Sequence, residues 1–241
     1  MLTGYIQGFD GSMLHVIVPF SDSELLERQE ITECEVHLHD GRSLSPKQRN
    51  KIFALVQDIT AYTSGYDAKK AAFNETLRAM QLCYVLDLTD SEAVRRALTY
   101  HYCDLQGIDL FSLSARGSDA LDMSTARDFI DWLVELCVEN GIPCQDTLLN
   151  RCEDIQRYLY ACVANRRCCL CGAKADIHEV DKVGAGRNRR KIAHLGQRVQ
   201  PLCRKHHGEE ENIGQAAFDA LHHLEAVRLD ETLCKKLGWK I

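Results

Sequence analysis

The chain has 241 residues, a formal net charge of −6 and 45% hydrophobic residues, a composition typical of water-soluble globular proteins. At this length it can hold two domains or one large one. No apolar run approaches the roughly 18 residues of a membrane span, and the N-terminus lacks the basic and then apolar pattern of a signal peptide. With 12 cysteines and no secretory signal, we expect reduced thiols, a metal site and a cytoplasmic location without membrane contact.

The predicted elements begin with short strands. Residues 3–8 and 12–18 are rich in β-branched and aromatic residues, and the Asp-Gly dipeptide at 10–11 is a hairpin signal. Residues 21–29 are polar and predict a short helix, and residues 33–39 alternate as another strand. We therefore expect a small mixed β-sheet in the N-terminal part.

Helices dominate the middle of the chain. Ser45 followed by Pro46 predicts an N-terminal cap, and the apolar positions after it fit a helix that extends to Tyr62. Further elements are predicted as helices at 68–81, 91–105 (started by Thr89 and Asp90), 124–140 (capped by Ser124 and closed by Asn140-Gly141) and from about 146 into the cysteine-rich segment, with a strand at 109–114 and a turn at 116–118. A helix at 213–224 and an apolar tail at 226–241 follow.

Two ligand pairs, Cys168/Cys171 and Cys203/His206, each enclose two residues. This spacing lets both side chains of a pair reach one ion from a tight turn, and two such pairs make a closed tetrahedral zinc site. Gly172 follows the first pair, where the chain of a zinc knuckle turns with positive φ. The pattern predicts structural Zn²⁺. The alternative is buried or redox-active thiols that share this spacing.

Further histidines lie inside and beside this frame. His178 lies in an alternating segment, 176–181, that predicts a short strand, His194 lies in the following loop, and His207 directly follows His206. If a helix begins at Cys203, the side chains of His206 and His207 point about 100° apart, so that one can bind zinc while the other faces elsewhere. A catalytic metal needs an open site of histidine, carboxylate or asparagine ligands, and a base to activate water.

The order CxxC, a strand with histidine and then CxxHH resembles the HNH (ββα-metal) endonuclease family, in particular the HNH nucleases of phages, over residues 166–210. The resemblance implies that His178 and His207 bind a catalytic divalent metal such as Mg²⁺ or Mn²⁺. It places Glu179 at the general-base position, where the family usually has histidine. The middle asparagine of the family falls near Arg198, which cannot bind a cation, and His194 is the candidate to replace it. The alternative is histidines that only pack or hydrogen-bond in the zinc module.

The charge is distributed unevenly. Residues 151–205 contain 13 Lys or Arg and 5 Asp or Glu, a net charge of +8, so the rest of the chain carries −14. A local basic field can hold phosphates while the remainder repels them. We expect DNA phosphates to contact Arg198 and the densest part of this segment, a glycine-containing loop with Arg187, Arg189, Arg190 and Lys191. The alternative is a charged surface that is only solvated.

A second resemblance covers residues 35–145. The segment Arg42-Ser-Leu-Ser, with the Gln, Asn, Lys and Phe that follow it, resembles the Orf (NinB) family of lambdoid phage recombination proteins. This resemblance implies a dimeric mediator that binds single-stranded DNA and works with the host's single-strand-binding protein and recombinase. The expected contacts are basic residues at a helix N-terminus, where backbone N–H groups also favour phosphate: Arg42, Lys47, Arg49 and Lys51. The alternative is a helix start with solvated charges.

These features predict an α+β protein with a small mixed N-terminal sheet plus helices, followed by a zinc-stabilised, HNH-like ββα domain. We expect a DNA-binding recombination domain at 1–145, a helical connector at 146–165, and the zinc domain with its helical tail at 166–241. The function we expect is binding of single-stranded or branched DNA and metal-dependent cleavage of it. The alternatives are a non-catalytic DNA-binding mediator with structural zinc, and a module that binds host recombination proteins.

Overall fold

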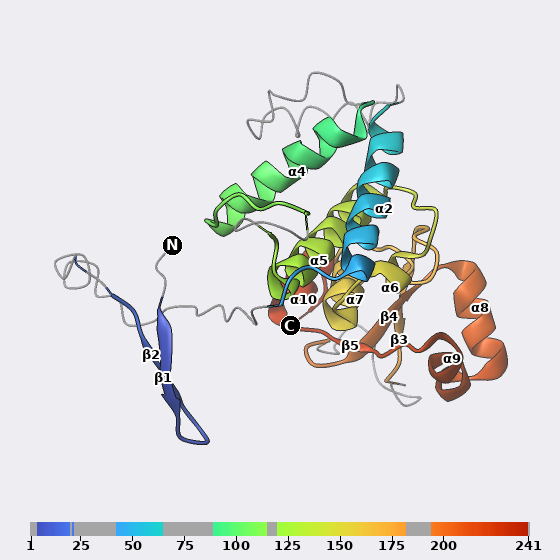
Figure 1. The fold of residues 1–241 in the computed structure, drawn as a ribbon. Helices are drawn as coiled ribbons and strands as arrows, with labels where there is room; N and C mark the ends of the chain where they lie inside the picture. Colours follow the sequence, from blue (N-terminus) through green and yellow to red (C-terminus); the bar gives the residue numbers. More distant parts are fainter. Residues whose placement is uncertain are drawn as a thin grey trace.

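The computed structural model describes residues 4–19, 21, 42–64, 89–114, 120–181 and 194–240. Within these, the fold is α+β, with one two-stranded sheet, one three-stranded sheet and helices between them (Figure 1). None of the described helices is both long and apolar enough to span a membrane. The elements predicted at 33–39, 68–81, 116–118 and, except for its first residue, 21–29 lie outside the described residues.

Strands β1 (Tyr5–Phe9) and β2 (Leu14–Ile17) form the predicted hairpin. The carboxylate of Asp10 in the turn accepts hydrogen bonds from the backbone N–H groups of Met13 and Ser12 at 2.8 and 2.9 Å. These hydrogen bonds lower the pKa of Asp10 to about 2. The hairpin therefore depends on a local turn, as its sequence predicts.

Helix α2 (Pro46–Thr63) begins at the predicted cap. The hydroxyl of Ser45 accepts a hydrogen bond from the N–H of Gln48 at 3.2 Å, and the Gln48 side chain accepts one from the N–H of Ser45 at 3.2 Å. This reciprocal capping box satisfies two N–H groups that the helix leaves unpaired. Gln48 also donates to the carbonyl of Met123 at 3.0 Å, which joins α2 to the start of helix α5 (Met123–Asn140).

Helix α4 (Ser91–Gln106) starts at the predicted cap, Asp90, and packs with α5 against α2. For α5 the predicted cap is wrong by two residues. The carboxylate of Asp122 accepts hydrogen bonds from the N–H groups of Ser124 and Thr125 at 2.9 and 3.0 Å. Asp and Ser are both good caps, and here the longer acidic side chain reaches two amides from outside the helix.

The strand predicted at 109–114 is not formed. Ser112 makes only an isolated bridge with Ala120, and no ladder continues from it in the described residues around them. The apolar side chains of this segment pack on α5 instead, with the rings of Phe111 and Phe129 5.3 Å apart at their centroids. The prediction failed because a buried irregular segment can show the same alternation as a strand.

The long helix predicted from about residue 146 is two helices, α6 (Leu148–Arg151) and α7 (Ile155–Ala164). Asp131 on α5 accepts hydrogen bonds from the N–H groups of Glu153 and Asp154 at 2.7 and 3.1 Å. These tertiary hydrogen bonds replace helical ones between the two helices, and Asp154 then caps α7. The apolar periodicity of the sequence does not reveal such a break.

The C-terminal part forms the three-stranded sheet and its flanking helices. Its elements are β3 (Asp176–Glu179), β4 (Arg198–Leu202), α8 (Arg204–Ile213), α9 (Gln215–His222), β5 (Val227–Arg228) and α10 (Glu231–Leu237). The strand order is β3-β4-β5 with antiparallel pairing, and β5 is a strand that we did not predict. Gly214, with φ of 82°, separates α8 from α9, and α9 lies within the helix predicted at 213–224.

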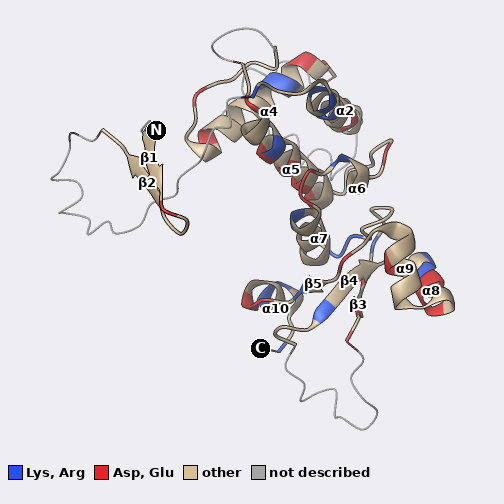
Figure 2. Ribbon diagram, turned by 60° about the horizontal axis from the view of Figure 1, so that its bottom comes forward, with Lys and Arg blue, Asp and Glu red and all other residues tan. Residues whose placement is uncertain are grey.

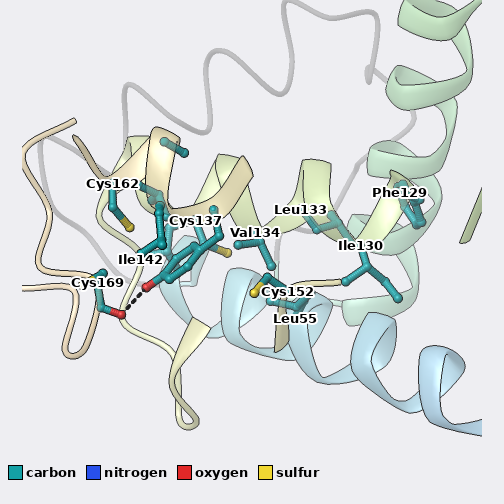
Figure 3. Packing of buried hydrophobic residues seen from close by; sticks show 14 of the residues in the cluster. Leu55, Phe129, Ile130, Leu133, Val134, Cys137, Ile142, Cys152, Cys162 and Cys169 are labelled. Carbon is teal, nitrogen blue, oxygen red and sulfur yellow. Dashed lines mark hydrogen bonds between the residues drawn. The ribbon is translucent and has the colours of Figure 1, made fainter. Parts of the chain in front are cut away.

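One cluster of buried hydrophobic residues extends along the described chain from Leu44 to Leu237 (Figure 3). Helix α7 contacts α5 on one side and β4, β5 and α10 on the other (Figure 1). Its Tyr158 hydroxyl donates to the backbone carbonyl of Cys169 at 2.8 Å, the dashed line in Figure 3. The predicted connector therefore lies inside a shared core, and the predicted domain limits at 145 and 166 stay a prediction.

The apolar tail packs against this core, as predicted. Its residues in or against the cluster are Val227, Leu229, Leu233, Leu237 and Trp239.

Candidate metal centre

Four predicted ligands converge where β4 ends and α8 begins. The ligand atoms of Cys168, Cys171, Cys203 and His206 all lie within 4.8 Å of one another. The sulfur atoms of Cys171 and Cys203 are 3.7 Å apart, and the Nδ1 atom of His206 lies 3.2 and 3.3 Å from the sulfurs of Cys168 and Cys203. In a tetrahedron with Zn–S bonds of about 2.3 Å, two sulfurs lie about 3.8 Å apart. The group therefore fits a closed zinc site with Nδ1 as the histidine ligand.

Local backbone geometry brings these side chains together. Gly172 has the predicted positive φ, 70°, and its N–H donates to the carbonyl of Cys168 at 2.8 Å, which closes the turn of the first pair. Cys203 is the N-cap residue of α8, so that His206 lies one helical turn further on. Cys169 is fully buried in the hydrophobic cluster. It does not belong to the group of converging ligand atoms despite its position beside a ligand.

The protonation of these thiols depends on a cation. Burial raises the pKa of Cys168 to about 12, so without a cation beside it this thiol keeps its proton at neutral pH. Burial also acts to raise the pKa of Cys203, but the N–H groups of His206 and Lys205 and the neighbouring thiols bring it below its ordinary value. Zinc binds thiolates, so binding would release the proton of Cys168 and make the affinity depend on pH.

A second group of potential ligands begins at the next residue of α8. His178, His207 and Glu210 place ligand atoms within 4.8 Å of one another. The Nδ1 atom of His178 is 2.8 Å from Nε2 of His207, and Nε2 of His178 is 3.5 Å from Oε2 of Glu210. The three side chains are 17%, 31% and 9% exposed, in that order, so the group is largely shielded from water but open at His207.

Regular geometry on β3 and α8 produces this second group. Alternation along β3 separates His178 from its neighbour Glu179, so that only His178 faces α8. On α8, Glu210 follows His207 by three residues, which places both on one face of the helix. His206 is turned about 100° away, toward the zinc ligands. Glu210 was not predicted; the sequence has an acidic run about one helical turn after the last motif histidine and does not single out one residue of it.

The spacing of the two rings suits a divalent cation. Adjacent ligands of an octahedral ion with bonds of about 2.1 Å lie about 3.0 Å apart, and the two facing nitrogens of His178 and His207 are 2.8 Å apart. Two ring nitrogens this close repel unless a proton or a cation lies between them. On their outer sides, His178 faces Oε1 of Gln215 at 3.2 Å and His207 faces Glu211 at 3.5 Å.

Two predicted catalytic residues are not brought to this group. Glu179 is exposed on the other face of β3. His194 packs on Trp239, with ring centroids 4.7 Å apart, and its backbone N–H donates to the backbone carbonyl of Lys240 at 2.9 Å. Neither belongs to the cluster of potential ligands, whose carboxylate comes from Glu210 instead. The motif-based assignment did not find Glu210 because the family pattern ends before it.

The predicted phosphate contacts of the zinc module are only partly described. Arg187, Arg189, Arg190 and Lys191 lie outside the described residues. Arg198 is exposed and holds Asp181 with two hydrogen bonds, 2.9 Å from Nε and 2.7 Å from Nη2. These hydrogen bonds lower the pKa of the Asp181 carboxyl. A phosphate would therefore compete with Asp181 for this guanidinium.

The basic residues at the start of α2 divide into two kinds. Lys51 is only 15% exposed, and its Nζ lies 2.7 Å from a carboxylate oxygen of Glu153. Arg42, Lys47 and Arg49 are exposed around the helix start. Figure 2 colours the Lys and Arg positions of the ribbon blue, including those on α2. Lys51 therefore holds α2 to the segment between α6 and α7, unlike the three exposed cations.

A Cys₃His group on a β-β-α unit, with histidines and a carboxylate gathered beside it, defines a ββα-metal module. Comparison with protein families agrees: the family described as "Putative HNHc nuclease" matches residues 66–240. The chain therefore belongs to this family of HNH nucleases. The match gives no support to the Orf (NinB) resemblance at 35–145. Comparison with curated proteins and with solved structures found no match.

Proposed function

We propose that this protein is a DNA endonuclease that depends on a divalent metal ion. In this proposal, Zn²⁺ stabilises the ββα module, and a second ion such as Mg²⁺ or Mn²⁺ occupies the site where the phosphodiester is hydrolysed. The zinc ligands are Cys168, Cys171, Cys203 and His206, and the ligands of the second ion are His178, His207 and Glu210. Membership of the HNH nuclease family supports the reaction class.

The observation that carries the proposal is the pair of ring nitrogens 2.8 Å apart beside a buried carboxylate. The Glu210 side chain is only 9% exposed, and a buried carboxylate is costly unless a positive charge balances it. His178 lies 3.5 Å from it and supplies that charge only when protonated. A divalent cation would balance Glu210 and separate the lone pairs of His178 and His207 at the same time.

Hydrolysis requires that a water oxygen form a bond to phosphorus while one P–O ester bond breaks and the leaving oxygen takes up a proton. When bound, a divalent cation stabilises the charge that develops on the phosphate oxygens. We assign the acceptance of the water proton to Glu211, in place of the predicted Glu179 and His194. Glu211 is 66% exposed and lies 3.5 Å from His207, at the open side of the group.

DNA is the proposed substrate because the exposed cations can hold its backbone. Arg42, Lys47 and Arg49 are exposed at the start of α2, and the basic segment 187–191 lies within the zinc module. Phosphate contacts of this kind make binding strongly dependent on salt. Preference for single-stranded or branched DNA, a dimeric state and work with host recombination proteins remain proposals that rest on the Orf (NinB) resemblance alone.

A second candidate function is a non-catalytic DNA-binding protein with structural zinc. Two residues favour it. The carboxylate at the family's general-base position, Glu179, lies on the far face of β3 from His178, and Arg198, near the position of the family's asparagine, is paired with Asp181. In this case the zinc ligands stabilise the fold, and the second group only stabilises contacts between β3 and α8.

Cleavage of end-labelled duplex, single-stranded and branched DNA tests the proposal. The zinc-loaded protein should cut at least one substrate when Mn²⁺ or Mg²⁺ is added, and lose activity with EDTA. His178→Ala, His207→Ala and Glu210→Gln should each reduce cleavage at least about 100-fold, the scale expected when an electrostatic contributor to the transition state is removed. Zinc content should stay unchanged, because none of the three is a proposed zinc ligand.

Matched controls separate a local loss from misfolding. His223→Asn, at an exposed position whose left-handed backbone Asn tolerates, and Glu231→Gln, in the exposed first turn of α10, should cleave like the unmodified protein. No cleavage of any substrate with any metal, together with salt-sensitive DNA binding that His207→Ala leaves intact, would establish the binding protein instead.

A further inference from the structure

We infer that Gln215, Gln200 and Asp219 form a positioning unit that fixes the His178 ring so that Nδ1, not Nε2, binds the second ion. None of the three belongs to either group of potential ligands. The inference rests on the proposed function, since it concerns the same site. In this inference, the three residues determine which nitrogen of the His178 ring carries the proton.

The unit joins three elements behind the His178 ring. Gln200 on β4 lies directly across from His178 on β3 and is fully buried. Gln215 is the first residue of α9, and Asp219 lies one turn further along the same helix. Gln215 is therefore held between the strand pair and its own helix, with His178 on its open side.

The hydrogen bonds fix the orientation of the Gln215 amide. Its Nε2 group donates to Oδ1 of Asp219 at 2.8 Å and to Oε1 of Gln200 at 2.9 Å, which uses both of its donors. Gln200 donates to the same oxygen of Asp219 at 2.6 Å, which fixes its own Oε1 toward Gln215. An ionised carboxylate only accepts hydrogen bonds, so Asp219 determines the direction of both amides.

The opposite orientation of the Gln215 side-chain amide would be unfavourable. It would turn the carbonyl oxygen of Gln215 toward Asp219 and toward Oε1 of Gln200, so that three acceptors would face one another with no donor between them. Polar groups shielded from water are destabilising when they have no hydrogen-bond partner. The carbonyl oxygen of Gln215 must therefore face His178, where it lies 3.2 Å from Nε2.

This orientation determines the tautomer of His178. Gln215 offers only an acceptor to Nε2, and Oε2 of Glu210, 3.5 Å from the same nitrogen, is also an acceptor. Nε2 therefore carries the proton, and the lone pair of the neutral ring is on Nδ1. That nitrogen is the one that lies 2.8 Å from Nε2 of His207. Such outer hydrogen bonds commonly orient histidines that bind metals.

The tautomer can be measured directly in the zinc-loaded protein without any second metal. Long-range ¹⁵N–¹H NMR at a pH of about 8.5, where histidine rings are generally neutral, distinguishes the two nitrogens of each ring. The His178 signals are assigned by their absence in His178→Ala. We expect the Nε2–H tautomer in the unmodified protein. A ring with the proton on Nδ1 would overturn the inference even if the protein cuts DNA.

Affinity for Mn²⁺, measured by titration calorimetry, tests the consequence. Gln215→Ala should weaken binding about 10- to 100-fold, as loss of such an outer partner typically does. Gln156→Ala, which changes a glutamine at an equivalent place in the first turn of α7, should leave the affinity unchanged. Unchanged affinity in Gln215→Ala would overturn the inference.

A double substitution that exchanges the amide and the carboxylate between positions 215 and 219 tests for recovery of Mn²⁺ affinity. Gln215→Glu alone places two carboxylates together and should weaken Mn²⁺ binding. Gln215→Glu with Asp219→Asn removes this repulsion, keeps an acceptor toward His178 and should recover most of the affinity. Failure of the double variant to recover, while it keeps zinc and its folded spectrum, would contradict the positioning role. Absence of DNA cleavage with all these results intact would reject the nuclease and leave this unit standing.

Discussion

The environment of Asp131 disfavours the ionised form of its carboxyl. The residue is 3% exposed, and burial raises the pKa of its carboxyl, although the N–H groups of Glu153 and Asp154 act to lower it. The folded protein therefore holds this proton more tightly than the unfolded chain does, for which the pKa is about 3.9. The contribution of Asp131 to the free energy of unfolding therefore decreases as the pH rises from the pKa of the unfolded chain through the higher pKa of the folded protein.

Replacement of Asp131 by Asn tests this reading. The amide oxygen can still accept the two backbone hydrogen bonds, and no charge is buried. We expect the free energy of unfolding of Asp131→Asn, relative to the unmodified protein, to increase between about pH 4 and about pH 7, in urea titrations at each pH. A difference between the two proteins that does not change with pH would show that the carboxyl pKa is not raised in the folded state.

At the scale of residues, prediction from the sequence worked where the chemistry is local. The Cys₃His ligands are two short motifs whose spacing alone requires a turn at each pair, and the structure brings all four together. Glu210 could not be selected in this way, since nothing in the sequence distinguishes it from Glu209 and Glu211. Only the position of α8 against β3 decides which of the three carboxylates reaches His178.

At the scale of elements, α8 links the two metal groups because His206 and His207 are consecutive on it. We therefore expect order in α8 to depend on zinc and to be required for the second group. Apparent binding free energies of structural zinc in small zinc-finger peptides are about 10–16 kcal/mol, enough to determine whether such a module folds. Loss of zinc should consequently abolish binding of the second ion, whereas loss of the second ion should leave zinc in place.

Cys203→Ser and His207→Ala test this asymmetry. Cys203→Ser should lose zinc, lower the melting temperature of the C-terminal part and lose Mn²⁺ binding, whereas His207→Ala should lose Mn²⁺ binding and keep zinc. Metal content and calorimetry measure both. Cys144→Ser, a partly buried cysteine outside both groups, is the control and should keep both metals. Retained Mn²⁺ affinity in zinc-free Cys203→Ser would contradict the dependence of the second site on the first.

Element boundaries were predictable where a cap or glycine acts within a few residues. Ser45 and Asp90 begin α2 and α4 as predicted, and Gly141 ends α5 in the left-handed conformation. The break between α6 and α7 was not predictable, because it depends on hydrogen bonds to Asp131 from a different helix. The third strand, β5, has only two residues, too few for a period to be seen.

At the scale of the whole molecule, a buried ion pair joins helix α2 to helix α6, which precedes the metal ligands in the sequence. Asp58 on α2 and Arg151 on α6 form hydrogen-bonded partners, with side chains 5% and 8% exposed. Asp58 also accepts a hydrogen bond from the N–H of Gln145 at 3.4 Å. Removal of one partner leaves the other charge buried without compensation, which is strongly destabilising.

Arg151→Ala should therefore lower the free energy of unfolding by about 3–5 kcal/mol. Asp58→Ala combined with Arg151→Ala should cost clearly less than the sum of the two single changes, because no charge then remains unpaired. Urea unfolding of the four proteins gives the coupling energy. Strict additivity would show that the two charges do not depend on each other in the folded protein.

The continuity of the core was the least predictable feature at this scale. Composition and motifs suggested a boundary between residues 145 and 166, since the zinc ligands begin just after it. In the described chain, α7 packs against α5, β4, β5 and α10, and the same hydrophobic cluster includes both sides. Apolar periodicity identifies a buried face of α7 but cannot tell which elements cover it.

The measurement that tests the central claim most directly is anomalous X-ray diffraction from crystals of the zinc-loaded protein soaked in Mn²⁺, with data at the zinc and manganese absorption edges. The account predicts a zinc peak among Cys168, Cys171, Cys203 and His206, and a separate manganese peak among His178, His207 and Glu210. A zinc peak alone, or manganese bound away from these three residues, would contradict a metal-dependent nuclease site at this position and favour a zinc-stabilised binding protein.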